Sequence, residues 1–297
     1  MKKKFLLKYF GIIGMILLLI SAVEIAIQPN KPFYLEEKNS TDIMFFGSSL
    51  CYCTFVPSVL SEYGISSYNM GKSQQTLPWT YYLMKDSLNY QKPRTIVLEP
   101  YGITYGDNTS DELDIGISNT SFDAMRFSIN QCKAVFDSVN ISRWNEFLFP
   151  IVRWHSNPDS LDELGKYQTQ DPNKGYVAFT EVGTAYPPSE QDLNDTNVTE
   201  LSKTAKKYLN RILKLTEENN IRLMIIRSPF PCDVEVNHQM NALKIWAESN
   251  SVPFLDLAYH HAEIGLDYNL DTIDGKHLNT SGSEKVSRFV GQYLSNN

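Results

Sequence analysis

Hydrophobic positions after residue 41 fall into short apolar runs separated by longer stretches with helical spacing. The runs expected to form strands cover residues 42–46, 65–70, 95–99, 221–226 and 252–257. The third run, Thr-Ile-Val-Leu-Glu, is rich in β-branched residues and does not alternate with polar ones, which is typical of a strand buried on both faces. The chain is therefore expected to build a sheet that is covered on both sides.

Helices are expected between these strands, over residues 57–63, 77–89, 200–219 and 236–249, and in a last segment that Thr280 or Ser281 caps. In the segment 200–219, apolar residues recur every three or four positions, which indicates an amphipathic helix. Strands that alternate with helices imply a parallel sheet with helices on both faces. The predicted fold class is α/β: a three-layer α/β/α sandwich with a mostly parallel, five-stranded, flavodoxin-like sheet.

The pattern breaks down between about residues 103 and 198. This stretch is rich in Asp, Asn, Ser and Thr, with short amphipathic pieces at 122–139 and 144–154. It is expected to be a long insertion after the third strand, and to form a lid over the carboxyl edge of the sheet. The main domain is assigned to residues 42–297, and residues 29–41, which are polar and contain two prolines, to a linker.

The N-terminal segment has the pattern of an export signal. Lysines at positions 2, 3, 4 and 8 precede 14 uninterrupted apolar or small residues, 10–23. Because a small-x-small cleavage site is missing, residues 1–28 are expected to form an uncleaved transmembrane signal anchor, with secretion after cleavage as the alternative. The lysines would then hold the N-terminus in the cytoplasm and place the domain outside it, at the cell membrane.

Composition excludes several classes of function. The net charge of −7 and the absence of a basic patch argue against a nucleic-acid partner. Four cysteines in 297 residues are no disulfide framework. No glycine-rich phosphate loop follows the first strand, and the adjacent His260 and His261 point apart in a regular element. Neither a cofactor nor a metal is therefore predicted.

Candidate chemistry lies where the first strand ends, at Gly47-Ser48-Ser49. The carboxyl ends of strands are where open α/β sheets hold their ligands. A serine becomes a nucleophile when an imidazole removes its proton, and a carboxylate then fixes the imidazole tautomer. His277 and Asp274, three residues apart near the other end of the chain, can supply these two groups. Taken alone, His277 is also compatible with a solvated loop histidine.

These motifs resemble those of the SGNH (GDSL-type) hydrolases. Gly47-Ser48-Ser49 corresponds to the first block with serine in place of the usual aspartate, Asn69-Met70-Gly71 to the second, and Asp274-Gly275-Lys276-His277 to the last. The third block is absent, and Glu99-Pro100-Tyr101-Gly102 stands in its place. The N-terminal segment and the insertion are similar to those of the membrane-anchored, extracytoplasmic branch, which includes the teichoic acid D-alanine-transfer protein and alginate O-acetyltransferase proteins.

The resemblance implies catalytic roles for Ser49, Asp274 and His277, and an oxyanion hole formed by the N–H groups of Ser49 and Gly71. The family's third donor, an asparagine, is missing, and Glu99 at that place can also be an ordinary buried strand-end carboxylate. Additional candidates for the site are Ser48, as an alternative nucleophile, and four residues that can act as donors or cations: Gln74, Tyr101, Arg153 and His155.

The expected function is that of a serine esterase or O-acyltransferase. The resemblance implies a substrate with acyl groups, in particular acetyl groups, on a cell-envelope glycan or polymer, or another small ester, and a membrane partner reached through the N-terminal helix. The alternative is a catalytically weak protein of the same fold that binds a polysaccharide or a membrane partner in an export assembly. The missing third-block asparagine favours this alternative.

Overall fold

The computed structural model describes residues 2–26, 38–108, 121–149, 152, 171–230 and 233–296. Its centre is a sheet of five parallel strands in the order β2-β1-β3-β4-β5. The strands are β1 (Ile43–Phe46), β2 (Ser67–Asn69), β3 (Thr95–Leu98), β4 (Arg222–Arg227) and β5 (Phe254–Asp256). The predicted five-stranded parallel sheet is confirmed, with each strand within three residues of its predicted bounds.

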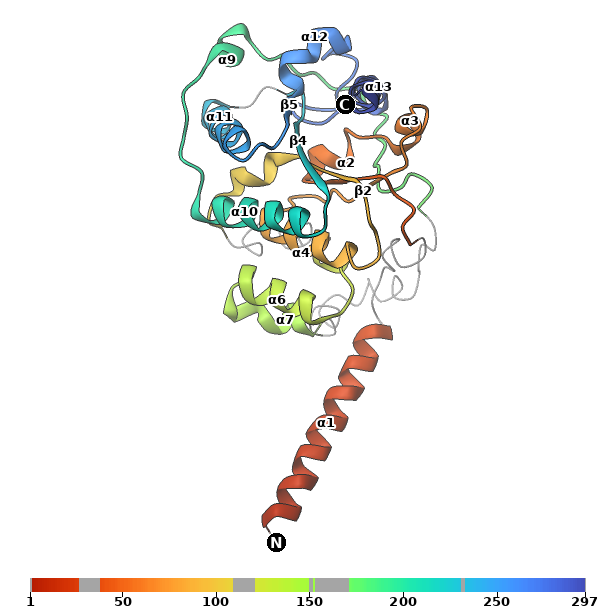
Figure 1. Ribbon diagram of the computed structural model, residues 1–297, viewed down its shortest axis with the longest axis vertical. Helices are drawn as coiled ribbons and strands as arrows, with labels where there is room; N and C mark the ends of the chain where they lie inside the picture. Colours follow the sequence, from red (N-terminus) through yellow and green to blue (C-terminus); the bar gives the residue numbers. More distant parts are fainter. Residues whose placement is uncertain are drawn as a thin grey trace.

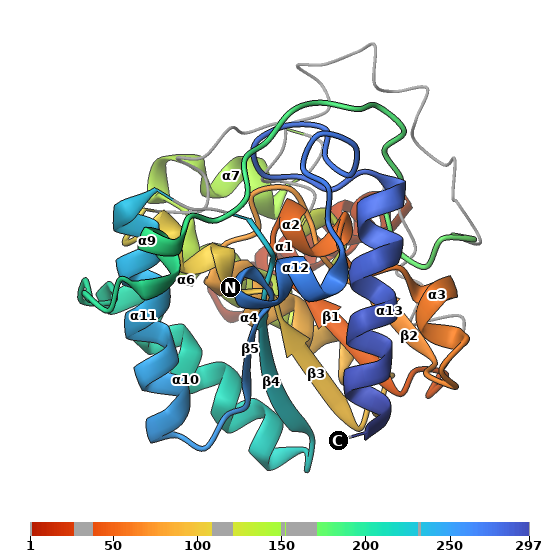
Figure 2. The same cartoon turned by 90° about the horizontal axis from the view of Figure 1, so that it is seen from above.

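Helices cover both faces of this sheet, as Figure 2 shows. One face carries α4 (Leu77–Ser87), α10 (Lys203–Glu218) and α11 (Val234–Ser249), and the other carries α2 (Ser49–Tyr52), α3 (Pro57–Ser61) and α13 (Thr280–Asn296). Shorter helices are η2 (Pro100–Tyr105), α9 (Glu190–Asn194), η5 (Leu257–His260) and α12 (His261–Ile264). The three-layer sandwich predicted from the alternating pattern is therefore the fold of this chain.

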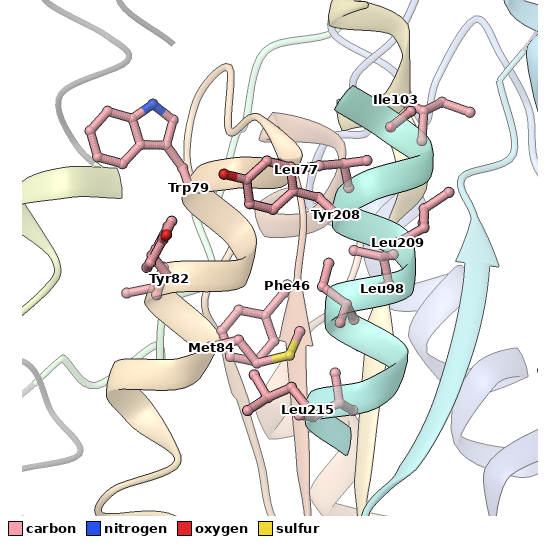
Figure 3. Close-up of a cluster of buried hydrophobic side chains, with 14 of the residues drawn as sticks. Phe46, Leu77, Trp79, Tyr82, Met84, Leu98, Ile103, Tyr208, Leu209 and Leu215 are labelled. Carbon is pink, nitrogen blue, oxygen red and sulfur yellow. The ribbon is translucent and has the colours of Figure 1, made fainter. Parts of the chain in front are cut away.

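Side chains of the strands alternate between two apolar clusters, because neighbouring residues of a strand point to opposite faces. Phe46 and Leu98 join the cluster under α4 and α10, together with Leu209, Leu215 and Met84 (Figure 3). Residues one position earlier on the same strands pack under α3 and α13. Burial on both faces holds the sheet between its helix layers and fixes where its carboxyl edge lies.

The strand order changes direction at β1. The chain passes from β1 to its neighbour β2 on one side, and then returns to β3 on the other. Loops that leave β1 and β3 therefore diverge to opposite sides of the sheet, and open α/β folds place their ligands in the resulting crevice. The Gly47-Ser48-Ser49 turn follows β1 and Glu99 follows β3, so both lie at this switch point.

The described parts of the insertion have two different locations. Helix α6 (Ile129–Ser138) packs against α4, with η3 (Ile141–Arg143) and α7 (Trp144–Leu148) beside it, away from the carboxyl edge (Figure 1). Residues 171–189, called the edge segment below, return along the carboxyl edge. The lid expected of the whole insertion thus fits only the edge segment among the described residues, because the apolar side of α6 is buried on α4.

The N-terminal helix α1 (Lys2–Ala26) stands apart from the sandwich in Figure 1. A helix needs about 20 consecutive apolar residues to cross a bilayer. Within the part of the chain that the structure describes, no helix is long and apolar enough to do so. The prediction of a transmembrane signal anchor, and of membrane partnering through it, is therefore wrong for these residues. Most of the predicted linker lies outside the described residues.

Candidate active site

Ser49 is the first residue of α2, directly after the turn that ends β1. Its Oγ lies 2.8 Å from Nε2 of His277, which is 228 residues away in sequence. Ser49 is partly exposed, and 25% of the His277 side chain is accessible. The two groups predicted to act together are thus within hydrogen-bond distance, and solvent reaches them.

Asp274 holds the other side of the imidazole. Its Oδ2 lies 2.9 Å and its Oδ1 3.1 Å from Nδ1 of His277. Oδ1 also accepts the backbone N–H groups of Lys276 (2.7 Å) and His277 (2.8 Å). Partial burial raises the pKa of Asp274, but the bonds from the His277 side chain and the two N–H groups outweigh it, so that the pKa falls below its usual range.

This arrangement selects one histidine tautomer. An ionised Asp274 accepts a hydrogen bond from the Nδ1–H group of His277, which leaves the lone pair of Nε2 free to accept the Ser49 hydroxyl. The loop itself is closed by the Ile273 N–H, which donates to the His277 carbonyl at 3.0 Å. Ser49, His277 and Asp274 are therefore brought together with the contacts that a nucleophile, a base and an orienting carboxylate require.

Ser48, the alternative nucleophile, faces away from this pair. Its Oγ donates to Oε2 of Glu99 at 2.8 Å, and its N–H donates to the same oxygen at 3.0 Å. The Oγ also accepts the Leu50 N–H (3.2 Å) and so caps α2. Ser48 is fully buried. Its contacts are those of a structural residue of the turn.

Gly47 is required by the carboxylate beside it. A Cβ at this position would lie 2.6 Å from Cβ of Glu99 and 2.8 Å from its Oε2. Burial raises the pKa of Glu99 to about 7, against the lowering effect of hydrogen bonds from the Ser48 hydroxyl, the Tyr101 N–H and the Ser48 N–H. A carboxyl group that is buried without a cation among the described residues is a recurring feature of functional sites.

Asn69 joins the second motif to the nucleophile helix. Its Nδ2 donates to the carbonyls of Cys51 (2.9 Å) and Phe55 (3.0 Å), and its Oδ1 accepts the Cys51 thiol (3.2 Å). The same Oδ1 accepts the N–H of Gly71 at 3.0 Å. Sequence reasoning assigned Asn69 no role of its own, although a polar residue inside a buried strand was the available signal.

The two expected oxyanion donors are therefore not equivalent. The N–H of Ser49 has no acceptor among the described residues, while the N–H of Gly71 is already bonded to Asn69. Gly71 can stabilise an oxyanion only by sharing its hydrogen with Asn69. A Cβ on Gly71 would lie 2.8 Å from Cβ of Cys51 and from the Tyr52 nitrogen, so this loop packs directly on α2.

The additional candidates lie in different places. The Tyr101 hydroxyl accepts a hydrogen bond at 2.7 Å from Nζ of Lys276, the residue that precedes His277. The backbone N–H of Tyr101 donates to Glu99. Gln74 has a backbone φ of +50°, and its buried Oε1 has no hydrogen-bond partner among the residues that the structure describes. Arg153 and His155 lie outside the described residues. Tyr101 is therefore placed at the rim of the catalytic loop.

The edge segment ties the two halves of the site together. Asn69 N–H donates to the Lys174 carbonyl (2.8 Å), and Val177 N–H to that of Tyr52 (3.1 Å) on the serine side. On the histidine side, Gly183 N–H donates to the Thr272 carbonyl at 2.7 Å.

No cluster of three His, Cys, Asp or Glu side chains that could hold a metal occurs within the described ranges.

The buried carboxyl group makes stability depend on pH. The pKa of Glu99 is about 7 in the folded chain and about 4.5 when unfolded, so its contribution is fully present below pH 4.5 and is lost as the pH rises through 7. At about 1.4 kcal/mol per pH unit, the unfolding free energy of the wild type relative to Glu99→Gln is expected to fall by about 3 kcal/mol between pH 4.5 and 8. Urea unfolding of both proteins checks this, and a difference that is constant with pH would contradict it.

Comparisons with known proteins give structural neighbours only. No family model and no curated protein matches the sequence. A protein described as lipolytic and of the G-D-S-L family, from Desulfitobacterium hafniense, matches with a TM-score of 0.42 and 11% identity over 86% of this chain and 98% of its own. A GDSL-like lipase from Bacteroides thetaiotaomicron matches with a TM-score of 0.41 and 11% identity over 89% and 94%.

A third neighbour is an acetyl xylan esterase from Butyrivibrio proteoclasticus. It matches with a TM-score of 0.37 and 10% identity, over 88% of this chain and 65% of its own. All three neighbours are named as ester hydrolases, and the sequence motifs described above resemble those of a hydrolase family. Since every TM-score is below 0.5, what this chain does has to be inferred from its own side chains.

Proposed function

We propose that this chain is a serine esterase or O-acyltransferase of the SGNH type, with Ser49 as the nucleophile. The observation that carries the proposal is the contact of Ser49 Oγ with Nε2 of His277 at 2.8 Å, with Asp274 on the opposite nitrogen. A serine, a histidine and a carboxylate in this order form a unit whose chemistry is acyl transfer. Hydrolysis of an ester is the simplest reaction of that class.

In the first half of the reaction Ser49 Oγ attacks the acyl carbonyl while its proton passes to Nε2 of His277. Asp274 stabilises the resulting imidazolium through Nδ1. The carbonyl oxygen becomes an oxyanion, which the free N–H of Ser49 can bind, with Gly71 as a second donor where it shares its hydrogen. The intermediate collapses when the alcohol leaves with the proton from His277, and the acyl group remains on Ser49.

In the second half an acceptor attacks the acyl group on Ser49. His277 removes the proton of the acceptor and returns it to Ser49 Oγ as the acyl bond breaks. Water as the acceptor releases a carboxylic acid, and a sugar hydroxyl gives a new ester. The same three residues serve both outcomes, and exclusion of water from the site decides between them.

The proposed substrate class is a short acyl ester, such as an acetyl group, on a glycan or another polymer of the cell envelope. The rim of the site is polar and partly aromatic, which supports a ligand of this class. The Tyr52 hydroxyl lies 3.1 Å from Ser73 Oγ, and its ring lies 6.4 Å from that of Phe179 in the edge segment. Tyr101 contacts the catalytic loop through its hydrogen bond from Lys276.

The test is labelling of the full-length protein with a fluorophosphonate, followed by mapping of the modified peptide. Such reagents react with activated serines, so one equivalent of label is expected on Ser49. The unlabelled protein is expected to turn over p-nitrophenyl acetate. Ser58, an exposed serine on α3, is the internal control and should remain unmodified. Modification of Ser48 would move the nucleophile by one residue. No labelling and no turnover would instead favour a polysaccharide-binding protein.

A further inference from the structure

Glu99 is buried directly behind the nucleophile turn. The N–H of Glu99 donates to the carbonyl of Phe46 at 2.8 Å, which continues the pairing of β3 with β1 and sets Glu99 beside Gly47. Only 1% of the residue is exposed. Substrate in the open site above therefore does not touch this carboxylate, and any influence of Glu99 on the reaction has to pass through the turn.

Three donors converge on the Glu99 carboxylate. The Ser48 hydroxyl and the Ser48 N–H donate to Oε2 at 2.8 Å and 3.0 Å, and the Tyr101 N–H donates to Oε1 at 2.9 Å. Ser48 Oγ simultaneously caps α2 by accepting the Leu50 N–H. The position of Ser49 is thus set by its two neighbours: Ser48 donates to Glu99, and the Leu50 N–H donates to Ser48 Oγ.

No cation balances this carboxylate within the described part of the chain. The titratable groups that face it are the thiol of Cys51 on α2, the thiol of Cys53 at the C-terminal cap of α2, and the phenol of Tyr105 on η2. The nearby negative charge of Glu99 raises the pKa of each beyond what burial does. All three are neutral near pH 7. Among the described residues, the charge of Glu99 is therefore stabilised by the Ser48 and Tyr101 donors.

We propose that Glu99 is a positioning residue for Ser49: its ionised carboxylate locks the Ser48–Ser49 turn against His277, and its protonation unlocks the turn and switches turnover off. The inference rests on the proposed esterase function. Ionised Glu99 accepts the three bonds from Ser48 and Tyr101 as an anion, and hydrogen bonds to an ionised acceptor are stronger than those to a neutral one. The added hydrogen of the protonated form also competes with the Ser48 or Tyr101 donors, so the bonds that hold the turn weaken.

The test is the pH dependence of kcat/KM for p-nitrophenyl acetate in wild type, Glu99→Gln and Asp86→Asn. Activity requires a neutral His277 and an ionised Glu99, so the logarithm of kcat/KM for wild type is expected to fall with a slope of about 2 at acidic pH. In Glu99→Gln the slope is expected to be about 1. At pH 8 its kcat should be lower by about tenfold and its KM within about threefold of wild type.

Asp86→Asn is the matched control. Asp86 is also a buried carboxylate, but it lies on α4 and accepts the Arg126 N–H, with no contact to the nucleophile turn. Its slope is expected to equal that of the wild type. Three results would overturn the inference: a slope of 1 in the wild type, a slope of 2 in Glu99→Gln, or a slope of 1 in Asp86→Asn. The first of these does not depend on any variant folding.

The labelling experiment separates this inference from the esterase proposal. If Ser49 is labelled and the wild-type slope is 1, the inference fails and the esterase proposal stands. If Ser49 is not labelled, the esterase proposal itself fails.

Discussion

Replacement of Ser49 by alanine is expected to lower kcat/KM for p-nitrophenyl acetate by at least about 10³-fold. Among the described residues, the substitution removes the one hydroxyl that contacts Nε2 of His277 and could carry the acyl group. What remains is binding and polarisation of the ester, which cannot replace covalent catalysis. The change also removes one methyl-sized polar group from a partly exposed position, so the fold should be retained, which thermal unfolding checks.

Two other serines serve as controls for this measurement: Ser58, which is exposed, and Ser48, which precedes Ser49 in the chain. Ser58→Ala makes the same chemical change at an exposed position of α3 and should leave turnover unchanged. Ser48→Ala removes the cap of α2 and one donor to Glu99, and is expected to reduce turnover by about tenfold without abolishing labelling. Near-wild-type turnover in Ser49→Ala, or complete loss only in Ser48→Ala, would contradict the assignment of the nucleophile.

Asp274→Asn is expected to lower kcat by about 10³-fold through the tautomer of His277. Oδ1 of an asparagine can still accept the N–H groups of Lys276 and His277, which orients its NH₂ group toward Nδ1 of the imidazole. Nδ1 must then accept, so that the proton moves to Nε2, and Nε2 can no longer take the proton of Ser49. Geometry and KM should change little, whereas kcat should fall at every pH.

Asp267→Asn provides the control for this second variant. Asp267 is exposed, lies in the same loop region and accepts the Asn269 N–H through Oδ1, which asparagine can also do. Steady-state kinetics of both variants should separate a specific effect on His277 from a general loosening of the loop. An Asp274→Asn enzyme with a kcat near that of wild type, or equal losses in both variants, would exclude the orienting role.

The apolar pattern was enough to predict the sheet and the two ends of the catalytic unit. Strands buried on both faces and helices with a clear apolar side leave few alternative arrangements, and the carboxyl ends of parallel strands meet at one edge. Ser49 at the end of β1 and His277 in the last loop could therefore be predicted to lie together. Asp274, three residues before His277, needed only a tight turn.

Other parts of the site depend on contacts that a sequence pattern does not contain. The pairing of Gly47 with Glu99 follows from the register of β1 and β3, and the orientation of the Gly71 N–H follows from the Asn69 side chain. A lid was predicted for the whole insertion, yet α6 is buried on α4, because amphipathic spacing indicates that a face is buried without saying against what. The prediction of an N-terminal anchor was also wrong within the described residues. It was based on lysines that precede an apolar run, which is a pattern of composition and does not test whether a helix is long and apolar enough to span a membrane.

The separation of 228 residues between Ser49 and His277 has a consequence for biosynthesis. A ribosome delivers the nucleophile turn long before it delivers the base, and closing so large a loop comes late in folding because its entropy has to be offset by contacts formed earlier. Ser287 on α13, which donates to the Thr54 carbonyl and accepts the Val56 N–H, makes the same long connection. A nascent or truncated chain that ends before residue 277 therefore lacks the proposed base, and under the proposed function Ser49 can take up an acyl group only after the last helix has docked.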